Sequence, residues 1–291
     1  MANNRNSRAD TLCQEAQALE KKFSLFSKAT NEINAADMYI KAANLYKASE
    51  EWDKAAEAFS NAHRLYTKND ERSEANKAKT NMALCKTKGS NPESGIEEYL
   101  LVVEKYIENG QFSQAAKTQA EVAKIYESLK NYEKASEAYL QAAEYYINDN
   151  RPASALPLRI SAAKLNALTG KYMEACEVFT TIGDECLQGG SLRFGAKDHF
   201  INAIICRIAA EDDIGALKAL TLFRKNDPSV SSERDYKIME EIIDSVKEND
   251  LEKFEEWTGK YAQIKQVDEF RKVMFDSIKQ KMEENENAEV L

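Results

Sequence analysis

The chain has 291 residues, of which 43% are hydrophobic, and a formal net charge of −9 at pH 7. This length suits one large or two ordinary domains, and the acidic balance argues against general nucleic-acid binding, which needs a basic surface facing phosphate. We expect no transmembrane helix, because no apolar run approaches the roughly 20 residues that span a bilayer. We expect no secretory signal, because the segment MANNRNSRAD has no apolar stretch.

The first irregular stretch is KKFSLFSKAT, at residues 21–30. Phe23, Leu25 and Phe26 lie there between lysines and serines, and they do not continue the apolar pattern that follows. Two interpretations stay open from the residues alone. The segment is either an apolar loop that makes weak contact with a membrane surface, aided by its lysines, or the end of a first helix whose two phenylalanines pack on the core.

Beyond this stretch an aromatic–alanine pattern recurs at multiples of 20 residues. WDKAAEAF begins at residue 52, and similar segments begin at 112, 132 and 172. The spacing places Trp52, Ala55, Ala56 and Phe59 on one face of a helix, where the alanines let a neighbouring helix approach closely. Segments such as GSNPES, LTGK and QGGS supply turns between the copies. One helix and one short turn per repeat predict a solenoid of antiparallel helix pairs.

We therefore predict an all-α fold with two parts. Residues 1–226 form a tetratricopeptide-like (TPR-like) solenoid with a right-handed superhelical twist, with alanines in place of the Leu-Gly pair of that repeat. The regular period ends near residue 226, and residues 227–291 form a helical bundle that caps the solenoid and ends in an acidic tail. The apolar residues of the last helix are spaced by four and form its core face: Phe270, Met274, Ile278 and Met282.

The sequence contains no motif typical of an enzyme, a metal site or a cofactor site. Phosphate-binding loops, zinc-protease motifs, hydrolase nucleophile motifs and paired metal-binding cysteines are absent. His63 and His199, the only imidazoles, are expected to pack or to face solvent. The cysteines are expected to be reduced and mostly buried, as in a cytosolic protein: Cys13, Cys85, Cys176, Cys186 and Cys206. We predict neither catalysis nor a cofactor.

Four segments together resemble the soluble NSF attachment proteins, in particular their α/β branch: AADMYIKAANLYKASEEWDKAAEAF, GQFSQAAKTQAEVAKIYE, SLRFGAKDHFINAIIC and DPSVSSERDYKIMEEIIDSV. The resemblance implies an adaptor that is monomeric alone and coats assembled SNARE four-helix bundles in several copies. The adaptor would recruit and stimulate the hexameric AAA+ ATPase N-ethylmaleimide-sensitive factor, which disassembles the bundle. This would take place on cytosolic faces of membranes, during vesicle fusion and intracellular protein transport such as ER–Golgi traffic.

The resemblance also implies where SNARE complexes bind. The surface would use basic side chains and one aromatic side chain: Lys88, Lys117, Arg159, Phe194, Lys197 and Arg234. Lys88 is the looser match, because the turn beside it is one residue longer than in the family. Basic residues that family members often carry are replaced here by Glu50, Gln111 and Pro157, and Arg159 compensates only for the last of these.

The resemblance places the ATPase contact at the other end of the chain. Acidic family positions are matched by Glu211, Asp244 and Glu248, whereas Lys247 replaces an acid. The segment EENENAEVL resembles the acidic family C-terminus, whose final leucine stimulates the ATPase. The tail is longer here, so either Leu291 or Val290 would take that role.

The alternative function is a general TPR-like scaffold or co-chaperone that grips helical or peptide partners. Such a protein would need a basic, asparagine-rich clamp within one repeat pair, and no such clamp is evident in the sequence. Co-sedimentation with a SNARE complex, with and without the nucleotide-bound ATPase, separates the two functions.

By resemblance, Phe23, Leu25 and Phe26 occupy the place of a family loop that enters the bilayer beside the SNARE membrane anchors. Changing all three to serine should spare folding and binding to soluble SNARE fragments. It should slow disassembly of SNAREs anchored in liposomes, because only there does membrane contact raise the local concentration of the adaptor. Equal losses on soluble and anchored substrates would instead assign these residues to the core.

Overall fold

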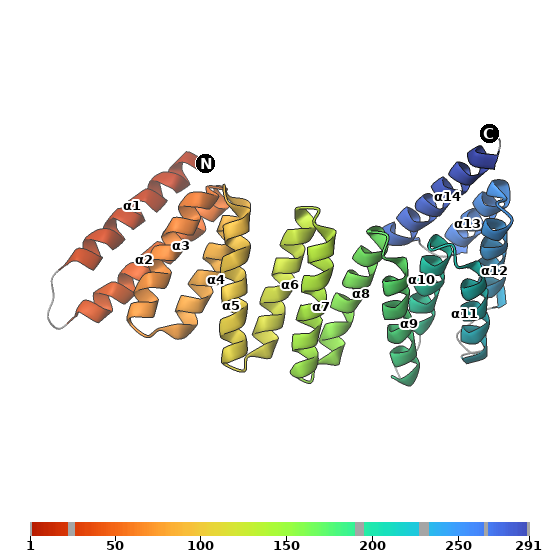
Figure 1. The fold of residues 1–291 in the computed structure, drawn as a ribbon. Helices are drawn as coiled ribbons and strands as arrows, with labels where there is room; N and C mark the ends of the chain where they lie inside the picture. The colour runs from red at the N-terminus through yellow and green to blue at the C-terminus, as the bar shows by residue number, and fades with distance from the viewer. Residues whose placement is uncertain (1, 23–26, 190–194, 227–232, 265–266, 290–291) are drawn as a thin grey trace. The chain divides into compact units, whose positions relative to one another are not determined.

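The computed structural model describes residues 2–22, 27–189, 195–226, 233–264 and 267–289. These residues form fourteen α-helices and no strand, and consecutive helices pack as antiparallel neighbours (Figure 1). The all-α solenoid predicted from the repeat is therefore confirmed. In the described part of the chain, no helix is both long enough and apolar enough to cross a membrane.

The chain divides into two compact units, each described here by itself. Unit 1 comprises residues 1–128 and 144–150, and unit 2 comprises residues 129–143 and 151–291. Unit 1 contains the first six helices: α1 (Ala2–Lys21), α2 (Lys28–Ala48), α3 (Trp52–Lys68), α4 (Arg72–Lys88), α5 (Pro92–Glu108) and α6 (Phe112–Ser128). Helix α7 (Tyr132–Asn148) contributes to both units. Unit 2 contains the remaining helices: α8 (Pro152–Leu168), α9 (Tyr172–Gln188), α10 (Ala196–Ala209), α11 (Asp213–Asn226), α12 (Glu233–Lys247), α13 (Leu251–Ile264) and α14 (Glu269–Glu289).

Helices α3 to α9 share one plan, which explains the period of the sequence. Each is 17 residues long, and from α3 to α9 the first residues of successive helices are 20 residues apart. A residue in the left-handed backbone region closes several of the turns, for example Glu50 (φ 60°), Asp70 (φ 59°) and Gly110 (φ 68°). The next amide then donates to a carbonyl five residues earlier, as from Glu51 N to Tyr46 O at 3.0 Å. This is the helix ending that a left-handed residue permits.

Small side chains let the helices of unit 1 pack closely. Ala55, Ala56 and Phe59 are buried on α3, and Trp52 packs against the same cluster, so the helix face predicted from the aromatic–alanine spacing is confirmed. An alanine loses no side-chain rotamer freedom on burial. The repeat therefore gains close helix contact at low entropic cost.

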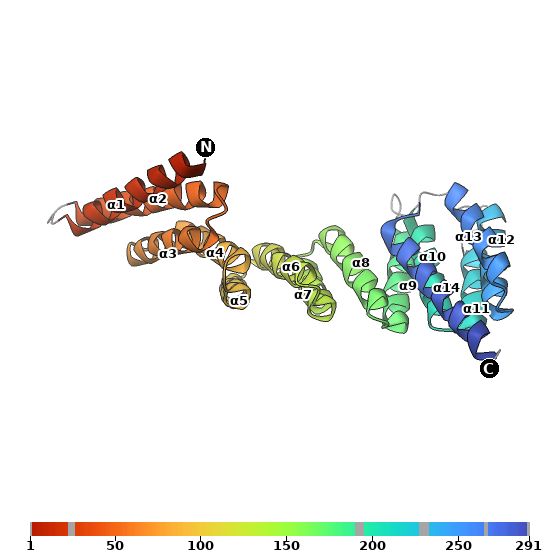
Figure 2. The same cartoon turned by 90° about the horizontal axis from the view of Figure 1, so that it is seen from above.

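Unit 2 contains one large buried cluster around α10, which is buried on most sides. Figure 2 shows α14 lying across α10, and α14 also contacts α8 and α13. The rings of Phe254 and Tyr261 on α13 pack edge-on against Phe275 of α14, with centroid distances of 6.3 and 5.9 Å. The predicted core face of the last helix is confirmed, because its four residues are all buried: Phe270, Met274, Ile278 and Met282.

The end of the regular repeat near residue 226 predicts a domain boundary there, and this boundary stays a prediction. Within unit 2, core residues from either side of that position belong to the same cluster, for example Phe223 of α11 and Ile238 of α12. The handedness of the solenoid twist likewise stays a prediction.

The cysteines are free thiols, and all but Cys13 are buried, as expected. Burial raises the pKa of Cys85 to about 11, and burial also raises the pKa of Cys206. Because the thiolate is the reactive form, these side chains are inert core residues at neutral pH. Nδ1 of His63 lies 3.0 Å from Ala75 O, which fits the packing role expected for that imidazole.

The close approach of α4 and α5 predicts that Gly95→Ala destabilises the protein by about 1–3 kcal/mol. A Cβ added at Gly95 would lie 2.6 Å from Thr87 N and 2.8 Å from Ala83 O, both backbone atoms. Urea denaturation followed by circular dichroism measures the change. The matched control is Gly259→Ala on α13, where an added Cβ meets nothing within 4 Å, and which should gain up to about 1 kcal/mol from helix propensity. A gain at both positions would contradict the packing of α4 on α5.

Candidate functional site

The basic residues expected to contact SNARE complexes are divided between the two units. Lys88 and Lys117 belong to unit 1, whereas Arg159, Lys197 and Arg234 belong to unit 2. The two sets are therefore considered separately.

In unit 1, Lys88 and Lys117 are both exposed. The ammonium group of Lys88, in the last turn of α4, lies 4.8 Å from the ring centroid of Trp52 at the start of α3. Such a cation–π contact is worth about 0.5–1 kcal/mol at an exposed site. Lys117 projects from α6, and it has no ion-pair partner among the described residues. The charge of Lys117 is thus available to an acidic partner.

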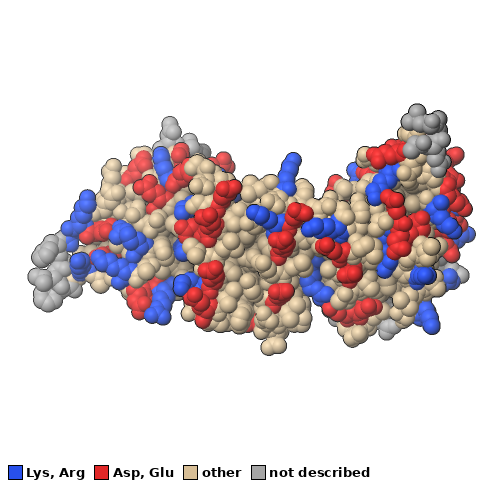
Figure 3. Space-filling model, viewed as in Figure 1, with Lys and Arg blue, Asp and Glu red and all other residues tan. Residues whose placement is uncertain are grey.

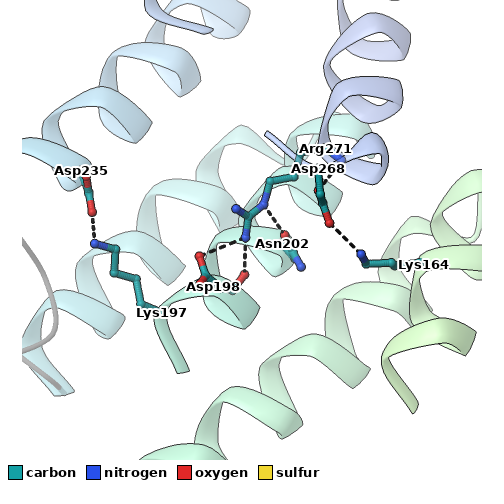
Figure 4. A network of polar contacts seen from close by, with 7 residues as sticks. All are labelled: Lys164, Lys197, Asp198, Asn202, Asp235, Asp268 and Arg271. Atoms are coloured by element: carbon teal, nitrogen blue, oxygen red, sulfur yellow. Dashed lines mark hydrogen bonds and ion pairs between the residues drawn. The ribbon is translucent and has the colours of Figure 1, made fainter. Parts of the chain in front are cut away.

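In unit 2, Lys197 of α10 contacts α12 at the residue next to Arg234. Lys197 forms an ion pair with Asp235, the residue after Arg234 (Figure 4). The side chain of Lys197 is 20% exposed and that of Asp235 is 10% exposed, while Arg234 is exposed. The charge of Lys197 is therefore compensated within the unit, and Arg234 carries the accessible positive charge at this point.

The Lys197–Asp235 pair also lines a narrow apolar cavity of about 30 Å³. Its walls include the stacked rings of Phe200 and Phe223, whose centroids are 3.8 Å apart. Pockets for organic ligands usually reach about 300 Å³ or more. The cavity is too small for a cofactor and has the character of a packing gap between α10, α11 and α12.

Arg159 lies on α8 and donates a hydrogen bond of 2.6 Å to Glu185 of α9. Pro157 is exposed two residues before it, inside the same helix. The other positions where a basic residue was expected, Glu50 and Gln111, are exposed turn residues. None of these three residues carries the positive charge that was expected at its position.

A buried arginine ties α14 to α10 (Figure 4). Arg271 is 7% exposed; its Nε donates to Asn202 Oδ1 at 2.8 Å and its Nη2 to the backbone oxygen of Asp198 at 3.1 Å. Nη2 also lies 3.3 Å from Asp198 Oδ1. A buried guanidinium is tolerated only when its donors are satisfied in this way. The network fixes where the last helix sits on the unit 2 core.

Two titratable groups flank this network. Burial alone would raise the pKa of Asp268, but its hydrogen bonds with Lys164 Nζ and the Arg271 amide outweigh burial and lower that pKa. Burial lowers the pKa of His199, and His199 Nδ1 is buried without a hydrogen-bond partner. His199 is thus a neutral imidazole at physiological pH, in agreement with the packing role expected for it.

The acidic residues expected to contact the ATPase lie on α12, in the turn that follows it, and in the turn between α10 and α11. Glu211 is in that turn, and its Oε1 lies 3.3 Å from Lys281 Nζ of α14. Glu248 Oε2 lies 3.3 Å from Lys253 Nζ, and Asp244 is half-buried on α12. Lys247 acts electrostatically on Asp213, so the start of α11 faces the end of α12. One end of unit 2 therefore carries the expected carboxylates together.

Charges of both signs are interspersed over the face shown in Figure 3, within each unit. Many of the ion pairs join two residues of a single helix, such as Lys77 with Glu74 and Lys105 with Glu108. This face does not show a large field of one sign. Charge recognition on this face must come from individual residues.

Several predicted site residues lie outside the described residues: Phe23, Leu25, Phe26, Phe194, Val290 and Leu291. Their roles stay predictions. Among the residues that are described, no group of His, Cys, Asp or Glu side chains could hold a metal ion.

Sequence reasoning missed the residues that pair with the expected cations. Asp235 and Glu185 carry no signal in the sequence, because they lie 38 and 26 residues from Lys197 and Arg159. Arg271 was missed for the same reason, since it lies 69 residues from Asn202. A basic residue directly after the core position Phe270 was the only available hint.

A family model described as "Soluble NSF attachment protein, SNAP" matches residues 7–283. A "Probable vesicular-fusion protein sec17 homolog" of Neurospora crassa is 29% identical over 111 residues, which is 38% of each chain. The alpha-soluble NSF attachment protein of Vitis vinifera is 28% identical over 113 residues, or 39% of each chain. That of Homo sapiens is 27% identical over 110 residues, covering 38% of this chain and 37% of the relative. The alignments thus span less than two fifths of these relatives' lengths.

Among solved structures, the crystal structure of BtubC (BKLC) from P. vanneervenii has a TM-score of 0.46 and 16% sequence identity. The match covers 78% of this chain and 91% of that chain.

The polar network predicts that Arg271→Met destabilises unit 2 by about 1–3 kcal/mol, because Asn202 Oδ1 is left buried without its donor. The matched control is Lys164→Met, which removes the more exposed ion pair with Asp268 and should cost less than about 1 kcal/mol. Thermal and urea denaturation of both variants measure the difference. If the two substitutions cost the same, Arg271 does not anchor α14.

Proposed function

Because this chain belongs to the soluble NSF attachment protein family, a family of non-enzymatic adaptors, we propose that it binds assembled SNARE complexes and recruits and stimulates the hexameric AAA+ ATPase N-ethylmaleimide-sensitive factor. The observation that carries the proposal is the family match over residues 7–283. The repeated helices support it, because a stack of similar helix pairs offers an extended surface to an elongated partner. We propose that several copies of a monomeric adaptor act on each complex.

SNARE complexes would be recognised by charge. An acidic helical bundle attracts exposed cations, and such contacts raise the association rate and select the partner more than they raise affinity. Lys117 and Arg234 are exposed and would make first contact. Lys197 and Arg159 are paired with Asp235 and Glu185, so each would have to exchange an internal carboxylate for one on the partner. We propose that these paired cations contribute selectivity and little net affinity.

The ATPase would bind at the end of unit 2 that carries Glu211, Asp244 and Glu248. Support for this comes from their placement at one end and from their carboxylate chemistry, which suits a basic receiving surface. The C-terminal residues Val290 and Leu291 would then reach the ATPase from the end of α14 and stimulate it.

The adaptor would work at the cytosolic face of membranes as a peripheral protein. Phe23, Leu25 and Phe26 would supply a weak membrane contact that matters only while SNARE binding holds the protein nearby. The direct test of the whole proposal is disassembly of purified SNARE complexes by the ATPase with and without this chain. Disassembly that proceeds equally well in its absence would reject the proposal.

The charge model predicts that Lys117→Glu weakens SNARE binding roughly 5- to 10-fold, because this lysine has no internal partner and charge reversal introduces repulsion. The loss should be larger at low salt, where exposed charges are less screened. Combined reversal of Lys117, Lys197 and Arg234 should nearly abolish binding without changing the far-ultraviolet circular dichroism spectrum.

The matched control for this prediction is Lys77→Glu on α4, an exposed lysine of the same unit at a position without a predicted role. It should bind SNARE complexes within about 2-fold of the unmodified chain. Salt-independent binding by the triple reversal would show that SNARE complexes dock on another face.

A further inference from the structure

The turn between α10 and α11 is held in a single conformation by several independent contacts. Glu211 adopts a left-handed backbone conformation with φ of 60°. Its amide donates to Ile208 O at 2.9 Å, and the amide of Asp212 donates to Arg207 O at 3.0 Å. These bonds close the end of α10 in the manner of the other left-handed turns.

Asp212 holds the same turn from the other side. Its Oδ1 accepts a hydrogen bond of 3.0 Å from Gly215 N, which caps the start of α11, and its carboxylate pairs with Arg207 of α10. A Cβ added at Gly215 would collide with that carboxylate and lie 2.5 Å from Arg207 Nη1. The turn from Glu211 to Gly215 is therefore compact and preorganised.

This rigid turn presents a large apolar side chain to solvent. Ile214 is 69% exposed, the highest value among the large hydrophobic side chains that the structure describes. The core face of α11 consists of Ala216, Leu220 and Phe223, and Ile214 lies on the opposite side, on the face of Lys218. Packing within the chain does not account for an isoleucine at this position.

Acidic residues lie on one side of Ile214. Glu211, Asp212 and Asp213 precede it directly. Burial, together with the neighbouring carboxylates of Asp212 and Glu211, raises the pKa of Asp213, so these negative charges lie close enough to oppose one another. An exposed apolar side chain next to charged groups has the composition of a protein–protein contact, in which a central anchor excludes water and charged groups form the rim.

We propose that Ile214 and Glu211 form one docking element, in which Ile214 fills an apolar pocket within a basic surface of the ATPase and Glu211 pairs with a cation beside that pocket. This rests on the proposed function, which assigns Glu211 to the ATPase contact, and it adds an apolar anchor to a contact so far described by charge alone. Because the turn is preorganised, little conformational entropy is lost when the two side chains dock together. Lys281, which pairs with Glu211, would be released at the same time.

The test measures binding of the nucleotide-bound ATPase hexamer to full-length chain on SNARE complexes. Ile214→Ser should weaken ATPase binding about 10-fold, the scale of an interface anchor, while Ile214→Leu should bind within about 2-fold of the unmodified chain. SNARE binding and the unfolding temperature should not change in either variant. The matched control is Leu222→Ser on the same helix, which removes a side chain that is 52% exposed and should bind the ATPase normally.

The outcomes separate this inference from the proposed function. If the unmodified chain binds the ATPase and Glu211→Lys weakens binding but Ile214→Ser does not, the docking element is wrong and the charge contact stands. If Ile214→Ser and Leu222→Ser weaken binding equally, α11 binds through a broad face and the inference is again overturned. If Ile214→Ser impairs only SNARE binding or self-association, Ile214 docks another partner. If the unmodified chain does not bind the ATPase at all, the proposed function itself fails.

Discussion

The close approach of helices through alanine faces is the constraint on which the described structure depends. A buried alanine pair, such as Ala55 and Ala56 of α3, leaves room for a neighbouring helix only if the two helices keep a constant position relative to each other along their axes. The fixed length of 17 residues and the 20-residue spacing of α3 to α9 keep that position. Left-handed turn residues such as Glu50 and Asp70 complete most of the repeats, because they let one helix end and the next begin with only three residues between them.

A regular stack of helices also determines which charged side chains can form ion pairs within the chain. Each helix has two helical neighbours in the stack, so a long basic side chain on one helix reaches a carboxylate on the next. Arg159 of α8 with Glu185 of α9 is a pair of this kind, whereas Lys197 of α10 pairs with Asp235 of α12, the second helix after it. The pair of Arg159 with Glu185 is partly exposed and contributes little stability. Lys117 and Arg234 are different, because exposure leaves their charge accessible.

The sequence was sufficient for features set by local spacing and insufficient for features set by distant pairing. The aromatic–alanine period predicted the helix faces around Phe59, and the spacing by four predicted the buried face of α14, because both follow from the geometry of one helix. The turn at Glu50 could not be predicted, since glutamate has no preference for a left-handed backbone. The partner of Arg271 lies 69 residues away on α10, and no local pattern encodes such a contact. For the candidate site, resemblance supplied the positions of the charges, but only the structure showed which of them are already paired.

Two polar contacts hold the last helix to α10, and the distance between them restricts how α14 can move. Arg271 bonds Asn202, and Lys281 Nζ donates to Ala209 O at 2.7 Å, so the anchors are about 15 Å apart along α14 and about 10 Å apart along α10. Two anchors fix both the position of α14 along its axis and its angle to α10. Sliding α14 by one turn would break both contacts together and leave Asn202 Oδ1 buried without its donor. The Lys281 anchor lies beside Glu211, at the turn that presents Ile214. Lys281 therefore links the later part of α14 to the turn between α10 and α11, whereas Arg271 links the start of α14 to the first half of α10.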